Sequence, residues 1–160
     1  MDITYPFIPK SNSKLRPGHF WPIKLSSGQF ACGIVLSVPT EKGLYNTRSF
    51  YVGLLNWTGK EKPTQYDLEL SPLQILDHGV AHIKTILTQG EAIEGQIDLV
   101  KNNLDIELTV TNQVYSQSSY VLKGFEIVRK STPKDHETLK TKSTWGYSVI
   151  VIRANRLLTK

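Results

Sequence analysis

Three apolar runs that follow one another closely near the N-terminus constrain the fold of this chain more than any other feature. They cover residues 19–25, 29–38 and 49–57, and a short polar turn that ends in Gly28 separates the first two runs. A glycine in such a turn can adopt the positive φ that a tight hairpin needs. The runs therefore predict three consecutive antiparallel strands.

The second run presents two faces of different size. Small residues at Ala31, Gly33 and Val35 alternate with larger side chains, and successive residues of a strand point to opposite faces. Small residues inside a strand permit a close approach or a sharp bend. Because Gly53 also interrupts the third run, we expect a strongly curved antiparallel sheet or a partial barrel. Large apolar residues of all three runs are expected in the core: Trp21, Ile34 and Leu55.

The middle of the chain predicts one or two short helices. Thr64 followed by Asp67 has the spacing of a capping box, in which two side chains satisfy free amides at the start of a helix. Residues 81–90 have the pattern of a second short helix that Gly90 closes.

The last third of the sequence predicts further strands. Residues 102–110 alternate between apolar and polar side chains, and residues 120–128 and 147–153 are rich in β-branched and aromatic residues. The alternation predicts a half-exposed strand with four residues facing inward: Leu104, Ile106, Leu108 and Val110. The expected fold class is α+β, rich in β-strands.

A length of 160 residues predicts a single domain over residues 1–160. Within it we expect residues 1–17, which contain three prolines, to form an extended lead-in. The lysine-rich segment 129–146 is expected to be a mobile basic loop. No apolar run approaches the roughly 18 residues that span a bilayer, and the N-terminus lacks the charge pattern of a signal peptide. The expectation is a cytoplasmic protein without a membrane partner.

Charge is distributed unevenly along the chain, although the protein as a whole carries a net charge of +5. Residues 1–60 carry a net charge of +5, residues 61–120 a net charge of −6, and residues 121–160 a net charge of +6. Two interpretations remain open. The opposite signs offset each other in the folded protein, or they form separate patches that steer charged partners.

No group of residues has the pattern of a catalytic or metal site. His78 and His82 are four residues apart, as zinc ligands on one helix are, and Asp77 is a candidate third ligand. Gly79 lies between the two histidines, and packing or capping is the simpler role for both. Cys32 is the only cysteine, and its apolar strand argues against an accessible thiolate. We therefore expect no catalytic residue, no metal, no cofactor and no enzymatic activity.

A small barrel that binds nucleic acid is the alternative function. Aromatic side chains exposed on a sheet stack with bases, and lysine or arginine contacts the phosphates. The third apolar run, however, contains no lysine or arginine. The aromatic residues that this alternative would use lie in the first and third runs: Phe20, Trp21, Phe50, Tyr51 and Trp57.

The segment "LRPGHFWPIKLSSGQFACGIVL" resembles the opening of immunity protein family 26 of bacterial polymorphic toxin systems. The similar phrase contains, in this order, a glycine, an aromatic residue, a proline, a leucine, a turn with a glycine and a strand that contains a glycine. "SFYVGLLNW" and "ILDHGVAHIKTI" follow in the same order, so the resemblance covers roughly residues 15–95. The positions that carry the phrase are Gly18, Phe20, Pro22, Ile23, Leu25, Gly28, Phe30 and Gly33.

The resemblance implies a cytoplasmic inhibitor that binds a cognate protein toxin and neutralises it by protein–protein interaction. The phrase contains no catalytic residues and does not identify the toxin, the stoichiometry or the oligomeric state. Tight interfaces combine a buried aromatic anchor with charges that steer the encounter. We therefore predict an interface on the acidic segment 91–107, with a tryptophan beside it. Its candidate residues are Trp57, Glu91, Glu94, Asp98, Asp105 and Glu107.

Overall fold

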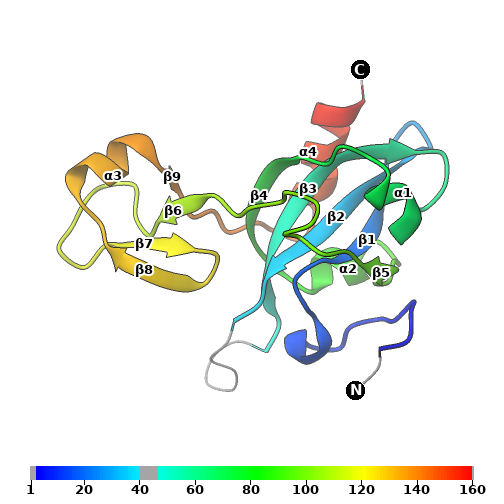
Figure 1. The fold of residues 1–160 in the computed structure, drawn as a ribbon, viewed down its shortest axis with the longest axis horizontal. Helices are drawn as coiled ribbons and strands as arrows, with labels where there is room; N and C mark the ends of the chain where they lie inside the picture. Colours follow the sequence, from blue (N-terminus) through cyan, green and yellow to red (C-terminus); the bar gives the residue numbers. More distant parts are fainter. Residues whose placement is uncertain (1–2, 40–46, 160) are drawn as a thin grey trace.

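The computed structural model describes residues 3–39 and 47–159, and Figure 1 shows how their helices and strands are arranged. A five-stranded sheet with the strand order β4-β3-β2-β1-β5 forms the larger part. A four-stranded sheet with the order β8-β7-β6-β9 lies to one side of it. The fold is α+β and rich in antiparallel strands, as predicted. Neither sheet is strongly curved or closed, so the expected partial barrel is wrong.

The first sheet contains β1 (His19–Lys24), β2 (Phe30–Ser37), β3 (Ser49–Gly59), β4 (Ile75–His82) and β5 (Gly95–Gln96). The predicted meander is confirmed, because β1 pairs with β2 and β2 pairs with β3, both antiparallel. Trp21, Ile34 and Leu55 have no exposed surface, also as predicted. Gly28 has φ +90° in the turn between β1 and β2.

The small face of β2 accommodates a ring instead of bending the sheet. Trp21 of β1 pairs directly with Gly33 of β2, and the indole ring occupies the space that a side chain at Gly33 would need. The sheet therefore stays open, with β4 and β5 as its two edges.

Both faces of the first sheet are covered by other parts of the chain, and a separate apolar core lies on each face. On one face, Trp21 and Phe50 belong to a core that includes Ile150 and Ala154 of the C-terminal helix. On the other face, Tyr51 and Leu55 belong to a core with Leu68 and with the segment that follows β5. Since both faces are buried, β1, β2 and β3 consist of largely continuous apolar runs rather than alternating ones.

The two helices predicted for the middle of the chain are present. The capping box between Thr64 and Asp67 is formed and starts α1 (Gln65–Glu69). The second helix, α2 (Lys84–Leu87), is shorter than its predicted range. Gly90 follows it with φ +70°, as a glycine that closes a helix does.

The prediction of a strand at 147–153 is wrong, because residues 149–153 form the first part of α4 (Val149–Leu158). Ile150 and Ala154, four residues apart, are buried on one side of the helix, while Ile152 is exposed. The β-branched run favours a strand locally, but packing against the first sheet decides the conformation. Of the helices in the described ranges, none is both long and apolar enough to cross a bilayer.

The second sheet contains β6 (Leu108–Val110), β7 (Tyr120–Lys123), β8 (Glu126–Lys130) and β9 (Lys140–Thr141). The segment predicted as one strand at 120–128 is a hairpin, in which Gly124 adopts φ +62° between β7 and β8. The strand predicted at 102–110 is reduced to β6. Leu104 packs on the first sheet, whereas Val110 is buried and Leu108 exposed in the second. The alternation failed as a prediction because the segment passes from one sheet to the other.

The two segments predicted to be irregular contain regular structure. Within residues 3–17, a short 3-10 helix, η1 (Asn12–Lys14), follows a bridge between Phe7 and Ile93. Within residues 129–146, α3 (Pro133–Thr138) begins with a second capping box, and β9 follows it. The mobility predicted for this basic segment stays a prediction, as does the single domain.

His19 is a fully buried histidine whose surroundings favour the neutral ring. Its Nδ1 accepts the backbone N–H of Arg16 at 3.0 Å, and its Nε2 lies 3.0 Å from the Tyr5 hydroxyl. Burial, followed by the nearby Arg16 charge, lowers the pKa of His19 from 6.5 to about 4. Protonation of Nδ1 would also replace the accepted hydrogen bond by a clash between two N–H groups.

We expect the free energy of unfolding to fall as the pH falls from about 6.5 towards 4. In that window the unfolded histidine binds a proton and the folded one does not, so stability rises with pH by at most about 3 kcal/mol. Urea unfolding at about pH 7.5 and about pH 4.5 measures the loss. His19→Asn is the control, because its amide oxygen can accept the Arg16 N–H without titrating. Equal losses in both proteins would contradict the assignment.

Candidate binding site

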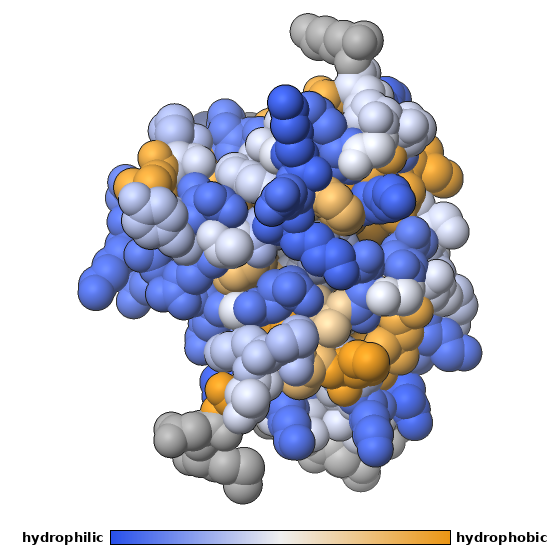
Figure 2. Space-filling view, turned by 90° about the vertical axis from the view of Figure 1, so that its right-hand side faces the viewer, coloured by the Kyte–Doolittle hydropathy of each residue, from blue (hydrophilic) through white to orange (hydrophobic). Residues whose placement is uncertain are grey.

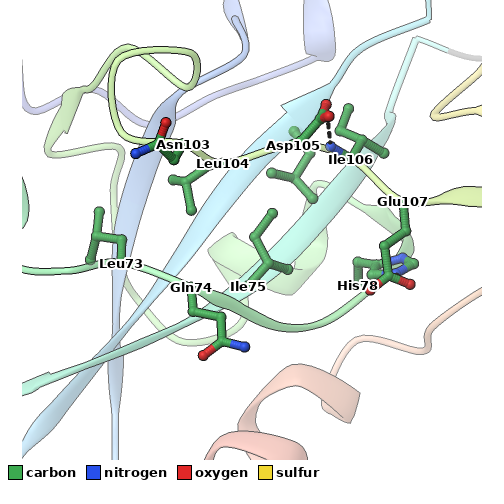
Figure 3. Close-up of a pocket in the computed structure, with 10 residues that line it drawn as sticks. Leu73, Gln74, Ile75, His78, Asn103, Leu104, Asp105, Ile106 and Glu107 are labelled. Atoms are coloured by element: carbon green, nitrogen blue, oxygen red, sulfur yellow. Dashed lines mark hydrogen bonds and ion pairs between the residues drawn. The ribbon is translucent and has the colours of Figure 1, made fainter.

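A pocket with a volume of about 240 Å³ lies where the chain leaves the first sheet for the second. Its walls come from two segments, residues 73–78 leading into β4 and residues 103–107 leading into β6. Figure 3 shows that these segments face each other, with Leu73 and Asn103 at one end and His78 and Glu107 at the other. Five apolar residues line it: Leu36, Leu73, Ile75, Leu104 and Ile106.

The polar groups of the pocket come from residues next to this apolar lining. Gln74 and Asn103 supply amides, and Asp105 and Glu107 supply carboxylates. The alternation of residues 104–107 explains the arrangement, since Leu104 is buried in the core beneath while Asp105 and Glu107 are exposed. The pocket therefore combines an apolar lining with acidic side chains that reach solvent.

His78 is the buried polar residue at the end of the pocket. Its side chain is only 8% exposed, and its Nδ1 lies 2.6 Å from the Tyr51 hydroxyl. Its Nε2 lies 3.5 Å from Oε2 of Glu107 but makes no hydrogen bond. Burial raises the pKa of Tyr51 to about 12, and the nearby charges of Glu107 and Asp77 add to this effect. Tyr51 therefore stays protonated at neutral pH.

The two carboxylates differ in their partners. Asp105 lies 3.4 Å from Nζ of Lys123, in an exposed ion pair that links the pocket to β7. Glu107 has a side chain that is 62% exposed, and among the described residues it pairs with His78 alone. Since His78 is charged only when it is protonated, Glu107 is the carboxylate at this site without a permanent cation beside it.

The other predicted interface residues do not line this pocket. Glu91 forms an ion pair with Lys62 at 3.3 Å. Asp98 accepts the backbone N–H of Lys101 and stabilises the turn after β5. Glu94 is half-buried and donates its backbone N–H to Phe20. The acidic segment 91–107 therefore contains groups with separate structural roles, and only its last two carboxylates face the pocket.

Trp57 also lies away from the pocket. It is half-buried, packs against the core on the α1 side of the sheet, and covers Gly59 with its ring. It lines a separate, open hollow together with Lys60, Glu61 and residues of α1. The structure thus does not bring Trp57 alongside Asp105 and Glu107.

The residues weighed as metal ligands have other partners. His78 and His82 lie on a strand and not on a helix, so their spacing of four residues separates them by about 13 Å. The Nδ1 atom of His82 accepts the backbone N–H of Lys84, and Asp77 pairs with Arg153 of α4. In the described ranges, no three His, Cys, Asp or Glu side chains are grouped as metal ligands are. Cys32 is fully buried, and burial raises the pKa of its thiol.

One pair beside the second sheet, formed by a residue after β8 and a residue of α3, has the distance of a nucleophile and its base. Ser131 Oγ lies 2.8 Å from Nε2 of His136, and Ser131 is buried. Nδ1 of His136 is buried without a hydrogen-bond partner, so no third group orients the ring. The neighbouring Asp135 binds Arg129 through both carboxylate oxygens and caps α3, and these bonds hold the pKa of Asp135 well below its usual range. We interpret this cluster as structural.

Of the five aromatic residues of the nucleic-acid alternative, Trp57 is half-buried and the other four are not available for base stacking. Phe20, Trp21, Phe50 and Tyr51 have no exposed surface. Figure 2 shows the face on the right of Figure 1, where hydrophilic side chains predominate and apolar ones form small groups. The stacking platform that this alternative needs is therefore absent from the first sheet as described.

We compared the chain with protein-family models, with curated proteins and with solved structures. No comparison gave a match. The resemblance to immunity protein family 26 consequently stays a prediction based on the phrase in residues 15–95. The sequence predicted Asp105 and Glu107 as interface residues, but it did not indicate that Tyr51 and the apolar lining belong to the same site. His78 was weighed as a metal ligand beside Asp77 and His82, with packing or capping as its simpler role, but no sequence pattern indicates that residue 78 meets residue 107.

Proposed function

We propose that this protein is a cytoplasmic immunity protein that binds a cognate bacterial toxin and neutralises it by covering its functional surface. The observation that carries the proposal is the pocket lined by Asp105 and Glu107. It combines apolar area that a partner side chain can bury with acidic groups that can steer a basic partner. The phrase shared with immunity protein family 26 supplies the class of partner.

The absence of a catalytic arrangement in the described residues agrees with a function by binding. His78 is held by Tyr51, Cys32 is inaccessible, and the Ser131–His136 pair lacks an orienting group. The carboxylates at the pocket, Asp105 and Glu107, are exposed. They fit a partner whose binding surface is basic, as the surfaces of toxins that act on nucleic acids often are.

Reversal of the charge at the pocket is expected to abolish protection. A cell that expresses the toxin encoded beside this gene should survive with the unchanged protein and die with the Asp105→Lys, Glu107→Lys variant. The dissociation constant of the purified complex should rise at least about tenfold. The measurements are survival on co-expression and titration of the toxin domain against each variant.

Glu137→Lys provides the matched control, because Glu137 is equally exposed but lies on α3, away from the pocket. This variant should still protect the cell and should bind the toxin domain with unchanged affinity. Full protection by the double variant would place the interface elsewhere, and the lack of any toxin gene in the neighbourhood would contradict the function itself. Submicromolar, salt-dependent binding of generic oligonucleotides would instead support the nucleic-acid alternative.

A further inference from the structure

We propose that the pocket between residues 73–78 and 103–107 binds the guanidinium group of an arginine side chain supplied by the partner protein. This inference rests on the proposed function for the source of the arginine, but its chemistry follows from the pocket alone. The site consists of the apolar lining, the Glu107 carboxylate and the buried edge of His78.

Two hydrogen-bond acceptors can face each other at the end of the pocket without a donor between them. The Tyr51 hydroxyl lies 2.6 Å from Nδ1 of His78, so Nε2 is the ring nitrogen available to a group bound in the pocket. When the ring proton is on Nδ1 and is donated to Tyr51, Nε2 presents a lone pair. The Glu107 carboxylate, 3.5 Å away, also only accepts. A buried nitrogen without a partner is costly, and a guanidinium that donates one N–H to Nε2 and another to the carboxylate would remove that cost.

The charge and shape of the pocket select a cation with an apolar stem. Glu107 has no lysine or arginine partner among the described residues, and Asp105 adds a second, partly neutralised carboxylate. Leu73, Ile75 and Leu104 line the pocket and can cover the methylene groups of a long side chain.

Arginine fits this arrangement better than lysine. Its planar guanidinium offers several N–H donors in fixed directions, so one group can donate to the carboxylate and to Nε2 at once. A lysine ammonium is a more strongly hydrated point charge and loses more solvation on entering a partly apolar pocket.

The test is an NMR titration of the full-length, ¹⁵N-labelled protein with N-acetyl-L-arginine amide. We expect saturable shifts of the His78 ring nitrogens and of the Glu107 amide, with a dissociation constant of about 1 mM, as befits a single small side chain. Glu107→Gln should weaken binding at least about tenfold, since the exposed side chain can be changed without disturbing the core. N-acetyl-L-citrulline amide, a neutral molecule of the same shape, should cause no saturable shift.

Asp98→Asn is the matched control, because it removes an exposed carboxylate that lines a different hollow. It should bind the arginine probe as the unchanged protein does. Equal shifts with the citrulline probe, or unchanged affinity in Glu107→Gln, would overturn the inference. No toxin enters this experiment. Arginine binding by a protein that gives a toxin-expressing cell no protection would therefore contradict the proposed function and leave the arginine site intact.

Discussion

Replacement of Gly33 by alanine is expected to lower the free energy of unfolding by about 3 kcal/mol, at the upper end for an overpacked core. A Cβ atom at Gly33 would lie 2.4 Å from Cζ2 of Trp21 and within 2.8 Å of two further ring atoms. The ring cannot move aside, because Trp21 has no exposed surface and packs edge-on against Phe50 at 5.7 Å between centroids. Urea unfolding of the purified variant measures the loss.

Two further variants make this prediction specific. Gly146→Ala should change stability by no more than about 0.5 kcal/mol, because its added methyl group would meet only Val149, at 3.9 Å. Trp21→Phe removes part of the ring, so Gly33→Ala should cost less in that background than in the unchanged protein. Equal costs in both backgrounds would show that the two residues do not compete for the same space.

The same pair explains why the meander was predictable and its curvature was not. Apolar runs, short turns and the glycine of the first hairpin are local signals, and they predicted β1, β2 and β3 with an error of one or two residues. Gly33 is also visible in the sequence. Whether a glycine in a strand marks a bend or makes room for a neighbouring ring depends on the register between β1 and β2, which the sequence does not state.

The errors in the last third of the chain have a related cause. Residues 102–110 alternate as a strand does, yet Leu104 and Val110 are buried by different sheets. Residues 149–152 are β-branched, but the first sheet offers an apolar face that a helix with Ile150 and Ala154 on one side can cover. In both segments the local pattern of a strand was present, but long-range packing decided which conformation formed.

The candidate site was predictable only in part for the same reason. The carboxylates at 105 and 107 stand out in an acidic segment, and the sequence interpretation named them. Tyr51 and His78 are diagonal neighbours on β3 and β4, a relation that follows from the pairing of Tyr51 with Val80. Their approach to Glu107 requires the chain to cross from the first sheet to the second at that point. Neither step leaves a signal in a single sequence.

Trp145→Ala is expected to cost about 3–5 kcal/mol, because it removes the side chain that attaches α4 to the edge strand of the first sheet. Trp145 is buried and lies against Gly79 of β4. Its backbone N–H donates to Val80 at 2.7 Å. Arg153 of α4 lies 5.3 Å from the centre of the ring and forms an ion pair with Asp77 of β4. Loss of the indole would leave a cavity and remove the ring that packs against this arginine.

The structure also predicts where the Trp145→Ala protein loosens first. Contacts at the start of α4 depend on the ring, whereas the pairing of β1, β2 and β3 does not. Hydrogen exchange should therefore accelerate in α4 and in residues 143–145 before it does so in the meander. Tyr147→Ala is the control, because this side chain is 44% exposed beside the same helix and should lose less than about 1 kcal/mol. Uniform acceleration across the sheet, or an equal loss in both variants, would contradict the assignment of Trp145 as the residue that attaches α4 to the sheet.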